Sequence, residues 1–155
     1  MHTDPTHGTH YCHILANNPN INAILITWGD NDIDQPGGTI NSGVAYDVVR
    51  SLISLLLFFI HRDVAVFIVP PLPRTTPSLA SHPAYTHAAM DITINLARHI
   101  KDLRIPYSPM IALPPLAMSA DGIHPTTLAY DQLRQHIISH INTQQQALRQ
   151  SGTHN

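Results

Sequence analysis

The run V-A-V-F-I-V, from Val64 to Val69, is apolar at every position and stops at Pro70 and Pro71. A strand that is covered on both faces of a sheet has this pattern, whereas a strand with one wet face alternates apolar and polar residues. The run A-I-L-I-T-W, from Ala23 to Trp28, is nearly as apolar. The two runs therefore predict two strands that are buried on both faces, as in a parallel sheet.

The segment between the two runs predicts a long helix. It extends from about Gly43 to Ile60, and Ser42 is a suitable N-cap for it. The most apolar part of this helix, from Ser51 to Ile60, is too short to span a bilayer. We therefore expect the helix to pack against the sheet, and we expect no membrane partner.

The C-terminal half continues the alternation of strands and helices. Apolar residues at helical spacing predict an amphipathic helix over about residues 84–103. Residues 105–111 predict a weaker strand, and Pro106 and Pro109 indicate that it is short or lies at an edge. A last helix is expected to start near Thr126.

Strand and helix thus alternate three times, after a short helix expected from about Thr9 to Ala16. This order predicts an α/β fold of right-handed βαβ units, with a parallel sheet and helices on both of its faces. We expect one domain over residues 1–150, followed by a tail of residues 151–155. Ligands of such sheets bind beyond the carboxyl ends of the strands.

Composition excludes several classes of function. Of the 155 residues, 43% are hydrophobic and only 12% are charged, with a formal net charge of −2. Lys101 is the single lysine and no basic patch is visible, so nucleic acid is not an expected partner. Cys12 stands alone, which excludes an internal disulfide. The N-terminal residues do not form a signal peptide, so a cytoplasmic location is the default expectation.

Two polar motifs follow predicted strands. In D-G-I-H-P, Asp121 stands three residues before His124, and a turn at Gly122 would let a carboxylate orient an imidazole that acts as general base. In G-D-N-D, from Gly29 to Asp32, Asn31 offers an amide donor for an oxyanion. Taken singly, each motif is better explained by ordinary turn residues, and Pro125 by a helix start.

Together, the two motifs resemble those of the SGNH (GDSL-type) hydrolase superfamily. That family carries G-x-N-D after its third strand, which Gly29 to Asp32 match, and D-G-x-H-P near its C-terminus, which Asp121 to Pro125 match. The family often has Gly-Tyr one turn later, where this chain has Ala129 and Tyr130. The resemblance covers roughly residues 6–141. It implies a flavodoxin-like, three-layer α/β/α fold and the hydrolysis of a small-molecule acyl ester without a cofactor.

The resemblance also assigns roles to residues. His124 is implied as general base, Asp121 as its orienting partner and Asn31 as an oxyanion donor. Gly29 and Asp32 complete the motif around Asn31. Gly8, in P-T-H-G-T-H, falls where the family has a glycine whose backbone N–H also donates to the oxyanion.

The family's nucleophile, a serine in a G-D-S block, has no counterpart in this sequence. No serine precedes Ser42, which is expected to be a helix cap. Cys12 lies within a predicted helix, and Ser119 is expected beside Asp121 rather than across from His124. We therefore expect the first strand and its serine to lie before Met1, so that the fold is truncated and the chain alone is inactive.

Two further expectations concern binding. A missing first strand would leave the strand at residues 23–28 with an open edge, which recruits a partner chain or leads to self-association. A non-catalytic binding module that keeps the cleft of this fold is the alternative to a fragment of an esterase. The remaining candidates are the histidine groups His7, His10 and His13 and the pair His136 and His140, for which no third metal ligand is evident, so no metal site is expected.

Overall fold

Two parallel strands form the sheet of this protein, for which a computed structural model describes residues 13–28, 42–76 and 78–152. Strand β1 (Ala23–Thr27) pairs with β2 (Ala65–Val69) in the register Ala23 with Ala65 to Thr27 with Val69. The crossover between them is α3 (Ser42–Ile60). This arrangement confirms the predicted α/β class and the βαβ unit.

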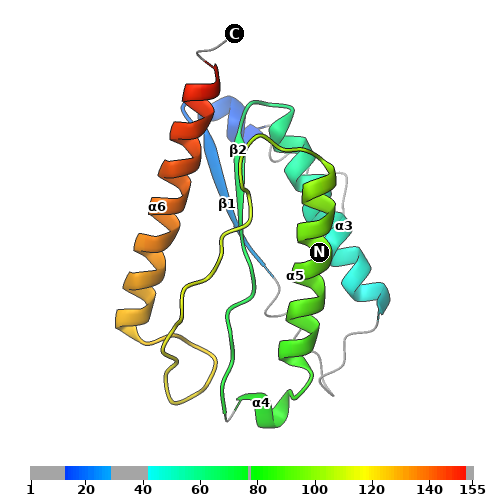
Figure 1. The fold of residues 1–155 in the computed structure, drawn as a ribbon, viewed down its shortest axis with the longest axis vertical. Helices are drawn as coiled ribbons and strands as arrows, with labels where there is room; N and C mark the ends of the chain where they lie inside the picture. The colour runs from blue at the N-terminus through cyan, green and yellow to red at the C-terminus, as the bar shows by residue number, and fades with distance from the viewer. Residues whose placement is uncertain (1–12, 29–41, 77, 153–155) are drawn as a thin grey trace.

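The remaining elements follow in chain order. Beyond β2 come the short helix α4 (Ser78–Ser81), the long helix α5 (Tyr85–Asp102) and the C-terminal helix α6 (Thr127–Gly152). Ahead of β1, residues 13–17 are helical, so the expected N-terminal helix is present in its described part. Helices α3 and α5 lie on one side of the two strands and α6 lies on the other (Figure 1).

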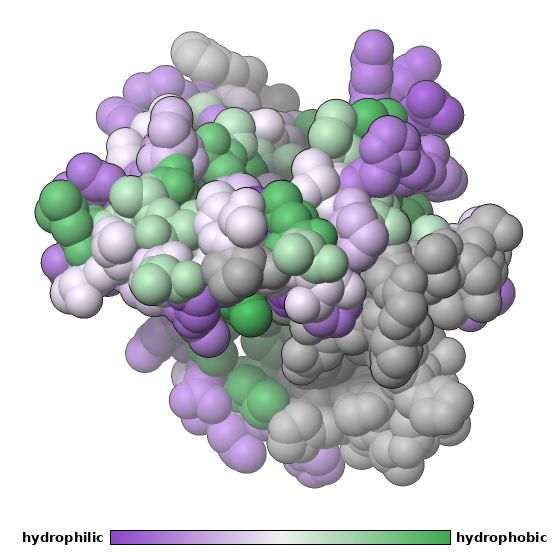
Figure 2. Space-filling view, turned by 90° about the horizontal axis from the view of Figure 1, so that it is seen from below, coloured by the Kyte–Doolittle hydropathy of each residue, from purple (hydrophilic) through white to green (hydrophobic). Residues whose placement is uncertain are grey.

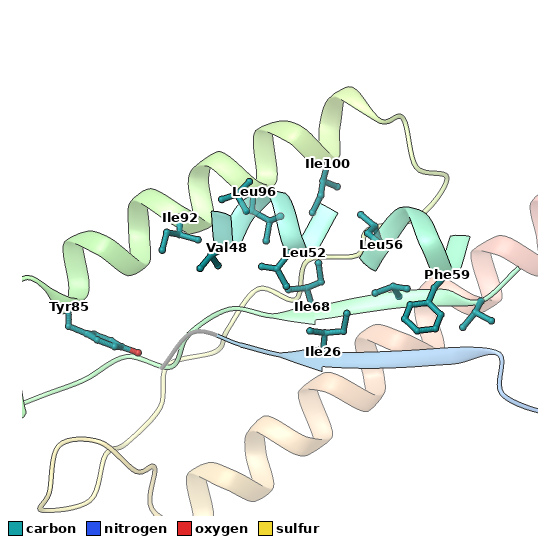
Figure 3. Close-up of a cluster of buried hydrophobic side chains, with 13 residues drawn as sticks. Ile26, Val48, Leu52, Leu56, Phe59, Ile68, Tyr85, Ile92, Leu96 and Ile100 are labelled. Carbon is teal, nitrogen blue, oxygen red and sulfur yellow. The ribbon is translucent and has the colours of Figure 1, made fainter. Parts of the chain in front are cut away.

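The larger core fills the layer between β1, β2, α3 and α5, as Figure 3 shows. Its buried apolar side chains come from all four elements; those drawn include Ile26, Val48, Leu52, Leu56, Phe59, Ile68, Ile92, Leu96 and Ile100. Each fully buried Leu, Ile or Phe contributes about 1.5–3 kcal/mol to folding. The apolar helix α3 therefore packs against the sheet, as predicted.

None of the helices in the described ranges combines the length and apolar character that crossing a membrane requires.

Strand β2 is buried on both faces, as its sequence predicts. Val66 and Ile68 face the core beneath α3 and α5, whereas Phe67 belongs to a second cluster on the opposite face. That second cluster also contains Ala65, Val69 and Ile111, and α6 covers it with Ile137, Ile141 and Leu148. The unbroken apolar run in β2 thus reflects two helical layers, one on each side of the strand.

Strand β1 departs from the prediction that both of its faces are covered. Ile26 is buried, but Leu25 is 43% exposed and Thr27 is also exposed. Alternate residues of a strand point to opposite faces, so Leu25 is on the face opposite to Ile26. On this opposite face α6 packs over Phe67 of β2, and no described helix covers Leu25. The apolar run therefore gave β1 correctly as a strand but overestimated its cover.

The third predicted strand, at residues 105–111, is reduced to one parallel bridge between Ile68 and Met110. The Ile68 N–H donates to the Pro109 carbonyl at 2.8 Å, and the Ile111 N–H donates to the Ile68 carbonyl at 3.0 Å. Proline has no N–H with which to continue the ladder, which explains why Pro109 limits the pairing. The strand prediction is therefore wrong in extent, although the segment lies beside β2 as expected.

Two residues before Ile68 in β2, a tyrosine side chain takes the place of main-chain pairing. The Tyr107 hydroxyl accepts from the Val66 N–H at 2.7 Å and lies 3.1 Å from the Val66 carbonyl, to which it donates. Burial raises the pKa of Tyr107 above its usual value, so the phenol stays neutral and can fill both roles. Both main-chain polar groups of Val66 on this edge are therefore satisfied without a third strand.

Side chains of α6 hold the same segment from its other side. His136 Nε2 lies 2.6 Å from the Ala112 carbonyl, and His140 Nε2 lies 2.8 Å from the Ser108 carbonyl. Gln144 Oε1 accepts from the Ser108 N–H at 2.9 Å. These residues recur every four positions and so share one face of the helix. Helix α6 thus fixes the chain that leads from the sheet to the next loop.

Candidate active site

A short hairpin-like loop carries Asp121 and His124, between residues 105–111 beside β2 and the start of α6. Met118 and Pro125 form an antiparallel bridge, and the Thr126 N–H donates to the Ala117 carbonyl at 2.9 Å. The Thr126 hydroxyl accepts from the Ala129 N–H at 3.2 Å, so Thr126 caps α6. Pro125 therefore belongs to the hairpin and not to the first turn of the helix.

Gly122 docks this loop onto the chain that leaves β2. Its φ of +71° is unfavourable for residues with a side chain, and a Cβ there would lie 2.3 Å from the Thr75 carbonyl oxygen. The Thr75 N–H also donates to the Gly122 carbonyl at 2.9 Å. The sequence suggested Gly122 as a turn residue, but the contact with Thr75 has no signal in the sequence because 47 positions separate the two residues.

The structure brings Asp121 and His124 into direct contact. His124 Nδ1 and Asp121 Oδ2 lie 2.5 Å apart. The other carboxylate oxygen, Oδ1, accepts from the backbone N–H groups of Ile123 at 2.8 Å and His124 at 2.9 Å, and from the Ser119 hydroxyl at 2.9 Å. The hydrogen bond from the His124 side chain, followed by these three, holds the pKa of Asp121 well below its usual range.

An ionised Asp121 determines where the imidazole proton resides. A carboxylate can only accept, so Nδ1 of a neutral His124 carries the proton and Nε2 carries the lone pair. The His124 side chain is 65% exposed and that of Asp121 is 46% exposed. Nε2 can therefore act as a proton acceptor toward a group that approaches from outside the loop.

The described hydroxyl groups do not reach this lone pair. Among the side chains that the structure describes, at residues 13–28, 45–76 and 78–152, no serine or threonine hydroxyl hydrogen-bonds to His124 Nε2. Ser119 instead contacts Asp121 and the His124 carbonyl oxygen, which confirms its predicted place beside the carboxylate. Ser42 is the first residue of α3, and Cys12 lies outside the described residues.

The residues expected to stabilise an oxyanion, and the motif residues around Asn31, are not described. Gly8, Gly29, Asn31 and Asp32 all lie outside the described residues. The sequence continues into residues 29–32 shortly after β1. The last residue of β1, Thr27, pairs with Val69 of β2. Both strands therefore end at the same edge of the sheet, and the chain beyond β2 is the one that docks against Gly122.

The two histidines of α6 show no sign of metal binding. Each uses Nε2 on a backbone carbonyl, as described above. No group of three or more His, Cys, Asp or Glu side chains suited to a metal ion occurs in the described part of the chain. His7 and His10 lie outside it, and His13 is at its first position.

Sequence reasoning missed an apolar groove of about 740 Å³. The chain beyond β2, helix α5 and residues 110–115 line it, with Pro71, Met90, Ile94, Met110 and Leu113 among the lining residues. Its signals in the sequence are the prolines at 70, 71 and 73 and the pair at 114 and 115, all of which line it. Figure 2 looks onto the end that carries α4 and the Asp121 loop, where apolar and intermediate residues occupy the centre and hydrophilic ones lie mostly toward the margin.

Comparisons with known proteins agree with this fold. The sequence matches no family model and no curated protein. Among solved structures, a GDSL-like lipase from Bacteroides thetaiotaomicron is similar with a TM-score of 0.67 and 17% sequence identity. The match covers 88% of this chain and 69% of the lipase chain. At this identity the likeness establishes the fold: this chain folds as a GDSL-like lipase does.

Proposed function

We propose that this chain is an ester hydrolase domain of the SGNH type, and that His124 and Asp121 are its general base and orienting carboxylate. The observation that carries the proposal is the contact between His124 Nδ1 and Asp121 Oδ2, which leaves Nε2 exposed. The GDSL-like fold supports it, because the pair lies on the loop between the sheet and the last helix.

The proposed chemistry is acyl transfer from a small-molecule ester. His124 Nε2 takes the proton of a nucleophilic hydroxyl as that oxygen attacks the ester carbonyl, and then delivers the proton to the leaving alcohol. Asp121 stays ionised and stabilises the imidazolium that forms between these steps. By resemblance, the Asn31 amide and the Gly8 N–H stabilise the negative charge on the carbonyl oxygen.

We propose that the nucleophilic hydroxyl comes from a segment outside this sequence. The sequence has no G-D-S block, and the serine nearest to the pair, Ser119, already hydrogen-bonds to Asp121. Water at the exposed Nε2 would give only slow hydrolysis. This chain by itself should therefore hydrolyse esters slowly. Addition of the segment that carries the nucleophile should restore activity.

The side of β1 away from β2 is the place where such a segment, or another chain, would add. Among the described residues β1 pairs with β2 alone, and its sequence has no charge or proline to discourage further pairing. Sedimentation velocity over a range of concentrations tests this part of the proposal. A monomer whose sedimentation does not change with concentration would contradict self-association at this edge.

Hydrolysis of p-nitrophenyl acetate by the chain, with His124→Ala as its partner variant, tests the catalytic proposal. We expect slow turnover that falls to the background rate in His124→Ala. His99→Ala is the matched control, because His99 is an exposed histidine on α5 whose ring hydrogen-bonds to the Asn95 carbonyl of the same helix. Equal rates for the chain and for His124→Ala would refute a base role, whereas fast His124-dependent turnover would refute the missing nucleophile.

A binding module without turnover is the second candidate, and the apolar groove favours it. A groove of about 740 Å³ with mainly apolar lining can hold most of a small ligand. Titration with octanoate, followed by NMR, distinguishes the two functions. Shifts confined to the groove around Met90 and Ile94, without His124-dependent hydrolysis, would favour binding alone.

A further inference from the structure

Ser119 makes more contacts with the Asp121–His124 pair than any role as a turn residue requires. Its hydroxyl lies 2.9 Å from Asp121 Oδ1 and 2.7 Å from the His124 carbonyl oxygen. Its backbone N–H donates to the same His124 carbonyl at 2.8 Å. The residue thus contacts the side chain of one partner and the main chain of the other.

These contacts restrict how the carboxylate can turn. Oδ1 accepts from three donors: two backbone N–H groups and the Ser119 hydroxyl, whose single proton is shared with the His124 carbonyl oxygen. Oδ2 faces His124 Nδ1. Rotation of Asp121 about χ2 would break all of these hydrogen bonds together. The serine supplies the one side-chain donor to Oδ1, so it is the only one of the three that a substitution can remove without altering the backbone.

Exposure makes such a restraint necessary. Asp121 is 46% exposed, so water competes for both of its oxygens. A carboxylate that is free to rotate in water would align one of its two equivalent oxygens with Nδ1 for only part of the time. The hydroxyl of Ser119 offsets this competition at the oxygen that faces away from the imidazole.

We infer that Ser119 is a positioning residue, whose hydroxyl holds the Asp121 carboxylate so that Oδ2 faces His124 Nδ1 and Nε2 keeps its lone pair. This inference rests on the proposed function in one respect, namely that the lone pair on His124 Nε2 acts as the general base. Ser119 itself neither touches substrate nor supplies the nucleophile. The same hydrogen bond also helps to keep the pKa of Asp121 low, as the last of the four contributions that lower it.

The test reads the imidazole directly, without substrate. In protein labelled with ¹⁵N-histidine, the ¹⁵N shifts of the neutral ring give the tautomer of His124, and exchange with water gives the lifetime of its Nδ1–H. We expect the wild-type ring to carry its proton mainly on Nδ1. In Ser119→Ala we expect a mixture of tautomers and Nδ1–H exchange that is about three- to tenfold faster, from the loss of one hydrogen bond.

Three further variants make the result specific. Ser119→Thr keeps the hydroxyl and should restore the wild-type tautomer and exchange rate. Ser119→Cys keeps the size with a weaker donor and should lie between wild type and Ser119→Ala. Ser54→Ala is the matched control, because Ser54 is an exposed serine whose hydroxyl donates to the Arg50 carbonyl of its own helix. It should leave His124 unchanged.

A wild-type tautomer and exchange rate in both Ser119→Ala and Ser119→Cys would overturn the inference. So would a lower melting temperature with an unchanged tautomer, because Ser119 would then only close the loop through the His124 carbonyl. If Ser119→Ala does not fold, the comparison of Ser119→Cys with Ser119→Thr decides. Absence of ester hydrolysis would refute the proposed function but not these ring measurements, so the two failures can be told apart.

Discussion

Replacement of Gly122 by Ala should detach the loop that carries Asp121 and His124. The added Cβ would lie 2.3 Å from the Thr75 carbonyl oxygen and 2.9 Å from the Thr75 carbonyl carbon, and main-chain atoms cannot rotate away as a side chain can. Alanine at a φ of +71° costs about 1–2 kcal/mol in addition. Relief of the overlap would break the Thr75–Gly122 hydrogen bond, which is worth about 0.5–1.5 kcal/mol.

If the loop shifts only far enough to relieve the overlap, the strained φ and the lost hydrogen bond together predict a loss of about 1.5–3.5 kcal/mol. If the loop undocks instead, the loss is limited to the free energy of docking, and the amide resonances of residues 118–126 should move. Urea denaturation followed by circular dichroism measures the first outcome, and ¹H–¹⁵N spectra measure the second. Ala120→Ser adds one atom to an exposed residue of the same loop and should behave like wild type.

Gly122→Asn separates the two causes. Asparagine tolerates a positive φ better than alanine does, but its Cβ meets the same carbonyl. We therefore expect Gly122→Asn to be nearly as damaging as Gly122→Ala. A free energy of unfolding within about 0.5 kcal/mol of wild type for Gly122→Ala, with the loop resonances in place, would show that the loop accommodates a Cβ at this position.

Further predictions concern the charge, the sheet edge and the core. The pKa of Asp121 lies below its usual 3.8, so the ionised carboxylate stabilises the loop above that pH. This contribution disappears only as the pH falls through the lower pKa of the folded state. A ¹³C titration should show Asp121 still ionised at pH 3.8, and half-protonation at that pH would contradict the hydrogen-bond network around it. Tyr107→Phe leaves the polar groups of Val66 without their partner and should cost about 1–3 kcal/mol in urea denaturation; an unchanged midpoint would show that water replaces the hydroxyl. Phe67→Ala should lower the free energy of unfolding by about 3–5 kcal/mol because Phe67 is fully buried. Leu25→Ala should lower it much less because Leu25 is 43% exposed. Equal losses would indicate that Leu25 is covered in solution.

Apolar patterning predicted the elements of this fold because it reports local burial. The run from Val64 to Val69 became a strand buried on both faces, and the spacing over residues 84–103 became α5 within one residue at each end. The same pattern overestimated the cover of β1 and the extent of the strand at residues 105–111. An apolar run shows that a strand exists, but not which helix covers each face or how far its pairing extends.

The sequence by itself determined the Asp121–His124 pair, because a turn of four residues brings both side chains together without help from the rest of the chain. Tertiary structure alone decided where that pair stands. The contact of Gly122 with Thr75 and the hydrogen bonds of Tyr107 with Val66 join segments that are more than 40 positions apart. Such contacts leave no periodic or local signal, since they depend on how packed layers bring distant main-chain atoms within hydrogen-bonding distance.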